Sequence, residues 1–103
     1  MSEKIISYWR ETKEIYRDKE NSQDNGLIFI IGQYDHKNRG KPSKALGIHW
    51  RNFPISRGVL APCVVPEKTR AIILAGLLHQ AMSEKNTGQI EEIMRAIDYF
   101  SKD

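Results

Sequence analysis

The sequence has little that would tie the chain to an oxidising compartment or to a membrane. Cys63 is the only cysteine among the 103 residues, so no disulfide can close within the chain. No apolar stretch approaches the ~18 residues of a membrane-spanning helix, and no apolar signal-peptide core follows the first charged residues. We therefore expect a cytoplasmic protein that does not contact a membrane.

Signatures of metal, nucleotide and catalytic sites are also missing. His36, His49, His79 and Cys63 never fall at the short spacing that places two metal ligands together. The glycines form no phosphate-binding pattern. A nucleophilic Cys63 paired with His49 or His79 is conceivable, because a thiolate is stabilised just before a helix. Its apolar neighbours are instead typical of a packed strand with an inert cysteine. We expect no enzyme, no metal and no cofactor.

The composition is that of a globular protein with an uneven distribution of charge. Hydrophobic residues make up 40% of the chain and charged residues 28%, which fits a single globular domain over residues 1–103. The net charge is +3, but residues 26–65 hold six Lys or Arg against one Asp, a net +5. The segments before and after that basic middle each carry a net −1.

Two helices are predicted in the C-terminal part. Pro66 and Glu67 are typical of a helix start, and residues 71–78 are apolar or glycine. This pattern predicts a helix over residues 67–85 that is buried nearly all round. Asn86 is a candidate cap, and an apolar stripe predicts a second helix that runs to about Phe100. The short connection predicts an antiparallel pair.

The N-terminal part is predicted as a helix followed by strands. Aromatic and apolar residues at three- and four-residue spacing predict an amphipathic helix over residues 2–20. Residues 27–34 and 45–51 have the composition of strands, and the polar residues 35–44 between them indicate a hairpin loop. Alternation along the second strand places Leu46, Ile48 and Trp50 in the core and leaves Ala45, Gly47, His49 and Arg51 partly exposed.

These elements predict an α+β fold in the order α-β-β-(β)-α-α. It has a two- or three-stranded antiparallel sheet, an N-terminal helix and a C-terminal antiparallel helix pair. The third strand would cover residues 59–65 and lie at an edge, because Pro62 cannot donate a ladder hydrogen bond.

The basic middle is the best-supported candidate site. Arg and Lys on a hairpin loop suit contact with a phosphate backbone, and no helix-turn-helix, zinc-finger or RNA-recognition signature is present. Trp50 or Phe53 would stack on an unpaired base if either is exposed. A solvated loop with no partner, or one facing an acidic protein surface, fits the same charges. The candidate anion-binding residues are Lys37, Arg39, Lys41, Lys44, Arg51 and Arg57.

We interpret the chain as a small non-enzymatic, regulatory binding module whose preferred partner is nucleic acid. The alternative is a protein-interaction adaptor or a homodimer. In that alternative, Tyr8, Trp9 and Tyr16 of the predicted N-terminal helix form the interface, because Tyr and Trp are favoured at interfaces.

Overall fold

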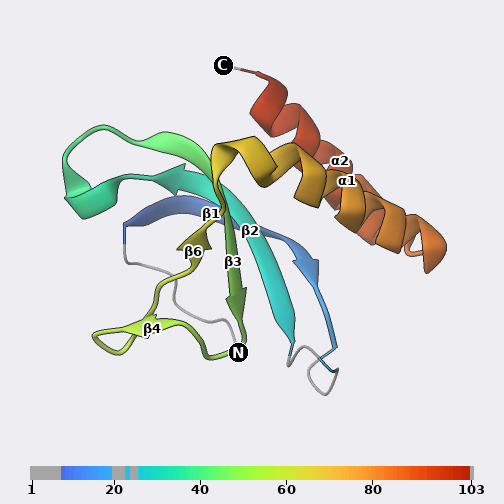
Figure 1. Cartoon of the computed structure of the whole chain (residues 1–103), viewed down its shortest axis with the longest axis horizontal. Coiled ribbons are helices and arrows are strands. Elements are labelled where there is room, and N and C mark those ends of the chain that lie inside the picture. The colour runs from blue at the N-terminus through green and yellow to red at the C-terminus, as the bar shows by residue number, and fades with distance from the viewer. Residues whose placement is uncertain (1–7, 20–22, 24–25, 103) are drawn as a thin grey trace. The chain divides into compact units, whose positions relative to one another are not determined.

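A computed structural model describes residues 8–19, 23 and 26–102, which form two compact units. In the described residues of the first unit, Met1–Val65, the regular elements are strands and one short 3-10 turn (Figure 1). The second unit, Pro66–Asp103, contains two helices. The strands are β1 (Trp9–Arg17), β2 (Leu27–Tyr34), β3 (Ser43–Trp50), β4 (Ile55–Ser56), β5 (Val59–Leu60) and β6 (Cys63–Val64). The helices are α1 (Glu67–Ser83) and α2 (Thr87–Ser101).

The predicted N-terminal helix is wrong, because Trp9–Arg17 forms the antiparallel strand β1 beside β2. Its register shifts twice, between Arg10 and Lys13 and between Glu14 and Tyr16. Each irregularity breaks the alternation of buried and exposed positions that identifies a strand in a sequence. The remaining spacing of apolar residues resembles that of a helix. Residues 2–7 and 20 of the predicted helix lie outside the described residues.

The hairpin predicted from residues 27–34 and 45–51 is confirmed, and its strands are β2 and β3. They pair in a continuous antiparallel register from Leu27 opposite Trp50 to Tyr34 opposite Ser43. The sheet order β1-β2-β3-β6 places β2 between two neighbours, as its uninterrupted apolar sequence predicts. The predicted sheet of two or three strands that follows an N-terminal helix is therefore wrong. In the described residues the fold is α+β and begins with strands: a four-stranded sheet and a separate β4–β5 hairpin precede the two helices.

The segment after β3 is extended, as expected, but it divides into two short strands. β5 pairs with β4, and β6 then pairs with β3 at the edge of the main sheet. Pro62 lies between β5 and β6, where its missing N–H interrupts neither ladder. The predicted edge position therefore applies to β6 alone.

The face of β3 that carries Ala45, Gly47 and His49 is buried, which corrects their expected exposure. Their exposed fractions place all three in the interior, and His49 is 0% exposed. The indole of Trp9 from β1 covers this face, and a Cβ on Gly47 would lie 2.8 Å from its Cη2 atom. Trp9 Nε1 also donates a hydrogen bond of 3.1 Å to the Pro62 carbonyl. The face is buried because a large ring lies over a residue without a side chain. On the opposite face, expected to lie in the core, Leu46 is buried but Ile48 and Trp50 are only half-buried.

The helix pair is confirmed, with the start of α2 capped as the sequence indicates. The Asn86 side-chain oxygen accepts the Gln89 N–H at 3.2 Å. The expected burial of α1 on all sides is wrong. Only Leu74 and Ala81 of α1 are buried, and Ile72 is 71% exposed. Neither described helix is long and apolar enough to cross a membrane.

Candidate nucleic-acid interface

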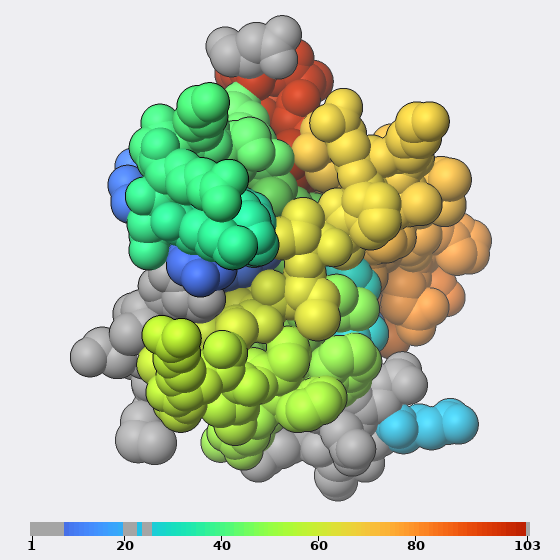
Figure 2. Space-filling view, turned by 60° about the vertical axis from the view of Figure 1, so that its left-hand side comes forward, coloured from blue at the N-terminus to red at the C-terminus, as the bar shows by residue number. Residues whose placement is uncertain are grey.

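The loop that joins β2 to β3 stands out from the first unit as a compact protrusion, coloured teal in Figure 2. It begins at Asp35, passes through the 3-10 turn η1 (His36–Asn38) and leads into β3 at Ser43. Lys37, Asn38 and Gly40 all have positive φ angles, of 60°, 52° and 76°. Such angles are uncommon outside glycine, so the loop has a tightly curled backbone that its surroundings must hold in place.

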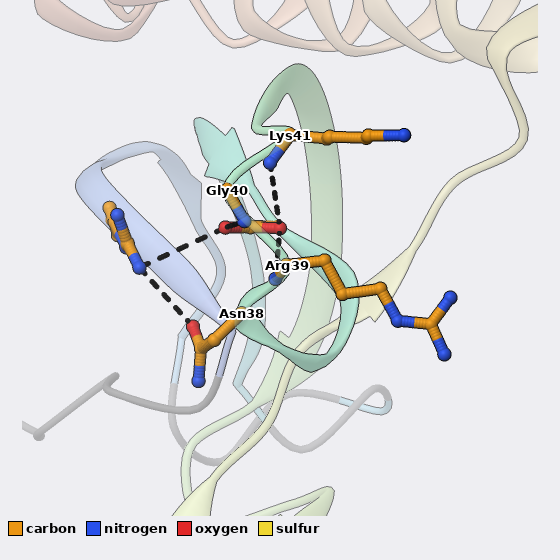
Figure 3. Close-up of polar contacts among 6 residues, drawn as sticks. Asn38, Arg39, Gly40 and Lys41 are labelled. Atoms are coloured by element: carbon orange, nitrogen blue, oxygen red, sulfur yellow. Dashed lines mark hydrogen bonds and ion pairs between the residues drawn. The ribbon is translucent and has the colours of Figure 1, made fainter.

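The carboxylate of Asp35 holds this backbone together from within. It is 1% exposed and accepts hydrogen bonds from the N–H groups of Arg39 at 3.0 Å, Gly40 at 2.9 Å and Lys41 at 3.3 Å (Figure 3). The Asn38 N–H donates to the Asp35 carbonyl at 2.9 Å. Four consecutive backbone N–H groups of the loop thus point at one buried residue, which fixes the conformation of residues 38–41.

Arg10 of β1 completes the environment of this carboxylate. Its guanidinium lies 3.8 Å from Asp35 Oδ2 and donates to the Asn38 side-chain oxygen at 3.4 Å. Burial by itself raises the pKa of Asp35, but the three loop N–H groups and the Arg10 charge outweigh burial and hold that pKa below its ordinary value. Asp35 is therefore ionised at neutral pH and offsets part of the positive charge around it.

The predicted basic residues of the loop surround this anchor. Lys37, Arg39 and Lys41 are exposed, and Figure 3 shows the Arg39 and Lys41 side chains extending away from the carboxylate. Lys44 is half-buried near the start of β3, opposite Gln33 of β2. The structure therefore brings four of the six predicted residues together at one end of the hairpin.

Arg51 and Arg57 lie at the other end of the hairpin. Arg51 directly follows β3, whose eight residues span about 25 Å. Arg57 lies in the turn between β4 and β5, where it and Gly58 have positive φ angles of 53° and 78°. Figure 1 shows the β2–β3 loop and β4 at opposite ends of the first unit. The predicted surface is therefore two separate basic groups.

The predicted aromatic interface is divided between the two faces of the sheet. Trp9 pairs with Tyr34 and Tyr16 with Phe29, and these partners project from opposite faces of β2. Trp9 is 3% exposed and belongs to the core, while Tyr8 and Tyr16 are half-buried. The adaptor hypothesis places these residues on one N-terminal helix, but over the described part of that segment Trp9 and Tyr16 belong to the strand β1.

An aromatic group beside the basic loop was not predicted from the sequence. The Tyr34 hydroxyl lies 2.9 Å from His36 Nδ1, and the rings of Tyr8 and His36 are 5.5 Å apart. Burial raises the pKa of Tyr34, and Tyr8 raises it further. The sequence signal was the alternation Tyr34-Asp35-His36 at the strand end, which directs both rings to one side of the buried carboxylate.

A shallow hollow lies at the Arg51 end of β3. Its volume is about 450 Å³, and its lining residues are Trp50, Arg51, Asn52 and Phe53. Trp50 and Phe53 exchange two backbone hydrogen bonds, of 2.6 and 3.1 Å, which close a tight turn. Their rings are 6.4 Å apart, and Phe53 is 64% exposed. The sequence predicts base stacking by Trp50 or Phe53 if either ring is exposed, and Phe53 meets that condition.

Cys63 and His49, one of the two pairs considered for nucleophilic chemistry, lie on opposite faces of the sheet, and His79 belongs to α1 in the second unit. Cys63 is exposed on β6 and lies opposite Ile48, so its side chain shares a face with Ile48. His49, the next residue of β3, projects from the other face and is buried. Among the residues that the structure describes, no three His, Cys, Asp or Glu side chains gather where they would share a metal ion.

The comparisons with known proteins assign no relatives. No protein-family model, no curated protein and no solved structure matches the chain. A functional proposal therefore rests on the residues of this chain alone.

Proposed function

We propose that this protein is a small non-enzymatic binding module whose β2–β3 loop contacts the phosphate backbone of nucleic acid. One observation carries the proposal. A buried carboxylate organises the loop from within, so that three exposed basic side chains project from a fixed backbone. The anchor holds the backbone that carries these side chains in one conformation before any ligand binds.

The anchor also determines which atoms meet the phosphates. Consecutive backbone N–H groups in a curled loop commonly bind an anion. Here the Asp35 carboxylate accepts hydrogen bonds from the N–H groups of Arg39, Gly40 and Lys41, so it occupies the position that a bound anion would take. Phosphate contacts therefore fall to the basic side chains. Because the backbone is already ordered, binding costs mainly the ordering of those side chains.

The charge distribution favours the same surface. The strand unit over residues 1–65 carries eleven Lys or Arg against seven Asp or Glu, while the helical unit carries five against six. Contacts with phosphates release counterions, which supplies most of the affinity of non-specific binding. A binding site for nucleic acid on this chain therefore belongs to the strand unit, and the loop is its most concentrated group of positive charges.

Fluorescence anisotropy with labelled DNA and RNA tests this proposal. The variant is Lys37→Ala, Arg39→Ala and Lys41→Ala combined, and the matched control is Lys68→Ala, Lys85→Ala and Lys102→Ala combined. Both triple variants lower the net charge equally, but the control residues belong to the helical unit.

We expect the wild-type chain and the control to bind at about 50 mM salt and the loop variant to lose most of its affinity. Equal losses in both variants would show that net charge, and not the loop, determines binding. An absence of binding by the wild-type chain would contradict the proposal. Strong competition by an acidic polypeptide with no nucleic-acid binding would favour an acidic protein surface as the partner.

A further inference from the structure

We infer that the hollow at the end of β3 stacks an unpaired base, which makes single-stranded nucleic acid the preferred ligand class. This inference rests on the proposed function, which makes the ligand a nucleic acid. It adds that the nucleic acid is single-stranded. The site consists of Trp50, Arg51, Asn52 and Phe53 and is separate from the β2–β3 loop.

Phe53 supplies an accessible aromatic surface on a rigid backbone. Its side chain is 64% exposed, so much of the ring surface is open to a ligand. The two backbone hydrogen bonds between Trp50 and Phe53 fix the position of its Cα atom. The half-buried Trp50 ring lies behind it, with the ring planes inclined by 46°. An exposed ring held in place in this way is the kind of platform on which bases stack.

The polar residues of the hollow match the other parts of a nucleotide. Arg51 brings a guanidinium, which binds phosphate and also stacks on planar groups. Asn52 is exposed and has both an acceptor and donors for the polar edge of a base. Arg51 also lines a second hollow with Arg17, Asp18, Lys19 and Gly26, where Arg17 is paired with Glu14 and Asp18 is acidic, so the surface beyond the aromatic residues carries both signs of charge.

The separation of the two basic groups favours a flexible strand over a duplex. The loop and the hollow lie at opposite ends of β3, about 25 Å apart. In Figure 2, the loop in teal and the β4–β5 hairpin in yellow-green both face the viewer. A single strand can follow such a path and present one base to Phe53. The bases of an intact duplex are stacked within it, and unstacking one costs free energy.

The experiment compares oligothymidylate of about 15 nucleotides with a duplex of the same length. The variants are Phe53→Ala, which removes the ring, and Phe53→Trp, which keeps an aromatic surface. Ile55→Ala is the matched control, because Ile55 is a nearby apolar side chain, 54% exposed, that does not line the hollow. Circular dichroism checks that each variant keeps its fold.

We expect Phe53→Ala to weaken binding of the single strand about 5- to 150-fold, the effect of losing one stacked base. Phe53→Trp and Ile55→Ala should bind like the wild-type chain, and the duplex should respond little to any of them. Quenching of tryptophan fluorescence by oligothymidylate should disappear in Trp50→Phe, which leaves Trp9 as the other tryptophan of the chain.

The outcomes separate this inference from the proposed function. Unchanged single-strand binding by Phe53→Ala, with a large loss in the loop triple variant, would overturn the stacking site and leave the loop proposal intact. If Phe53→Ala weakened single-strand and duplex binding equally, the stacking site would also be overturned. Stacking on an unpaired base requires a larger loss for the single strand. No binding by the wild-type chain would contradict both.

Discussion

At the scale of single residues, Asp35 has the clearest structural role in the candidate site. Its carboxylate is buried, yet it is ionised because three loop N–H groups and Arg10 stabilise the negative charge. The sequence predicted the exposed basic residues of this loop, since they need only a polar segment rich in Lys and Arg. It did not predict the role of Asp35, because nothing in a polar run distinguishes a buried carboxylate from a solvated one.

Replacing this carboxylate should loosen the loop without unfolding the strand unit. In Asp35→Asn, one acceptor oxygen becomes an NH₂ group that faces backbone N–H donors, so at least one donor loses its partner. We expect faster hydrogen exchange at the amides of Arg39, Gly40 and Lys41 and a several-fold weaker affinity for nucleic acid. Asp98→Asn on α2 is the control, because Asp98 is an exposed partner of Lys102. Unchanged loop exchange would refute the role of Asp35 as an anchor.

The same carboxylate gives the loop a defined response to acid. Because the folded pKa of Asp35 lies below its unfolded value, its stabilisation is present above about pH 4 and is lost as the pH falls through the folded pKa. Amide chemical shifts of the loop followed by NMR from pH 7 downwards should titrate below pH 4. That titration should be absent in Asp35→Asn. A midpoint above the ordinary value would contradict the hydrogen-bonding account.

At the scale of elements, the contact between β1 and β3 explains which parts of the fold were predictable. The β2–β3 hairpin and the helix pair follow from local signals, namely turn residues, apolar periodicity and the Asn86 cap. β1 was mistaken for a helix because its two irregularities remove the alternation of a strand. The burial of the Gly47 face of β3 involves Trp9, which is distant in sequence. Long-range packing of this kind leaves no local pattern.

Gly47 tests that packing directly. In Gly47→Ala, the new Cβ would lie 2.8 Å from two atoms of the Trp9 ring, so the ring or the strand must shift. We expect the free energy of unfolding to fall by about 1–3 kcal/mol, as for other overpacked cores. Gly76→Ala is the matched control on α1, where a Cβ meets nothing within 4 Å. Denaturant unfolding should show that control gaining about 0.5–1 kcal/mol. Similar effects of the two changes would disprove the close contact.

At the scale of the whole molecule, the chain divides by charge as well as by structure. The strand unit holds both basic groups, and the helical unit has a small negative excess. The basic middle is evident in the sequence, but the sequence could not show that β3 separates its charges into two groups about 25 Å apart. That separation follows from the lengths of paired strands and is visible only once the register is known. It divides one predicted surface into two, for which we propose phosphate binding at the loop and base stacking at the hollow.

The salt dependence of binding tests the phosphate-binding role of the loop most directly. The logarithm of the association constant for duplex DNA should fall linearly with the logarithm of salt concentration, with a slope of about −3 if the three exposed basic residues of the loop meet phosphates. The combined Lys37, Arg39 and Lys41 to Ala variant should be shallower by about 2–3 units, while the control on the helical unit keeps the wild-type slope. An unchanged slope in the loop variant would contradict the account.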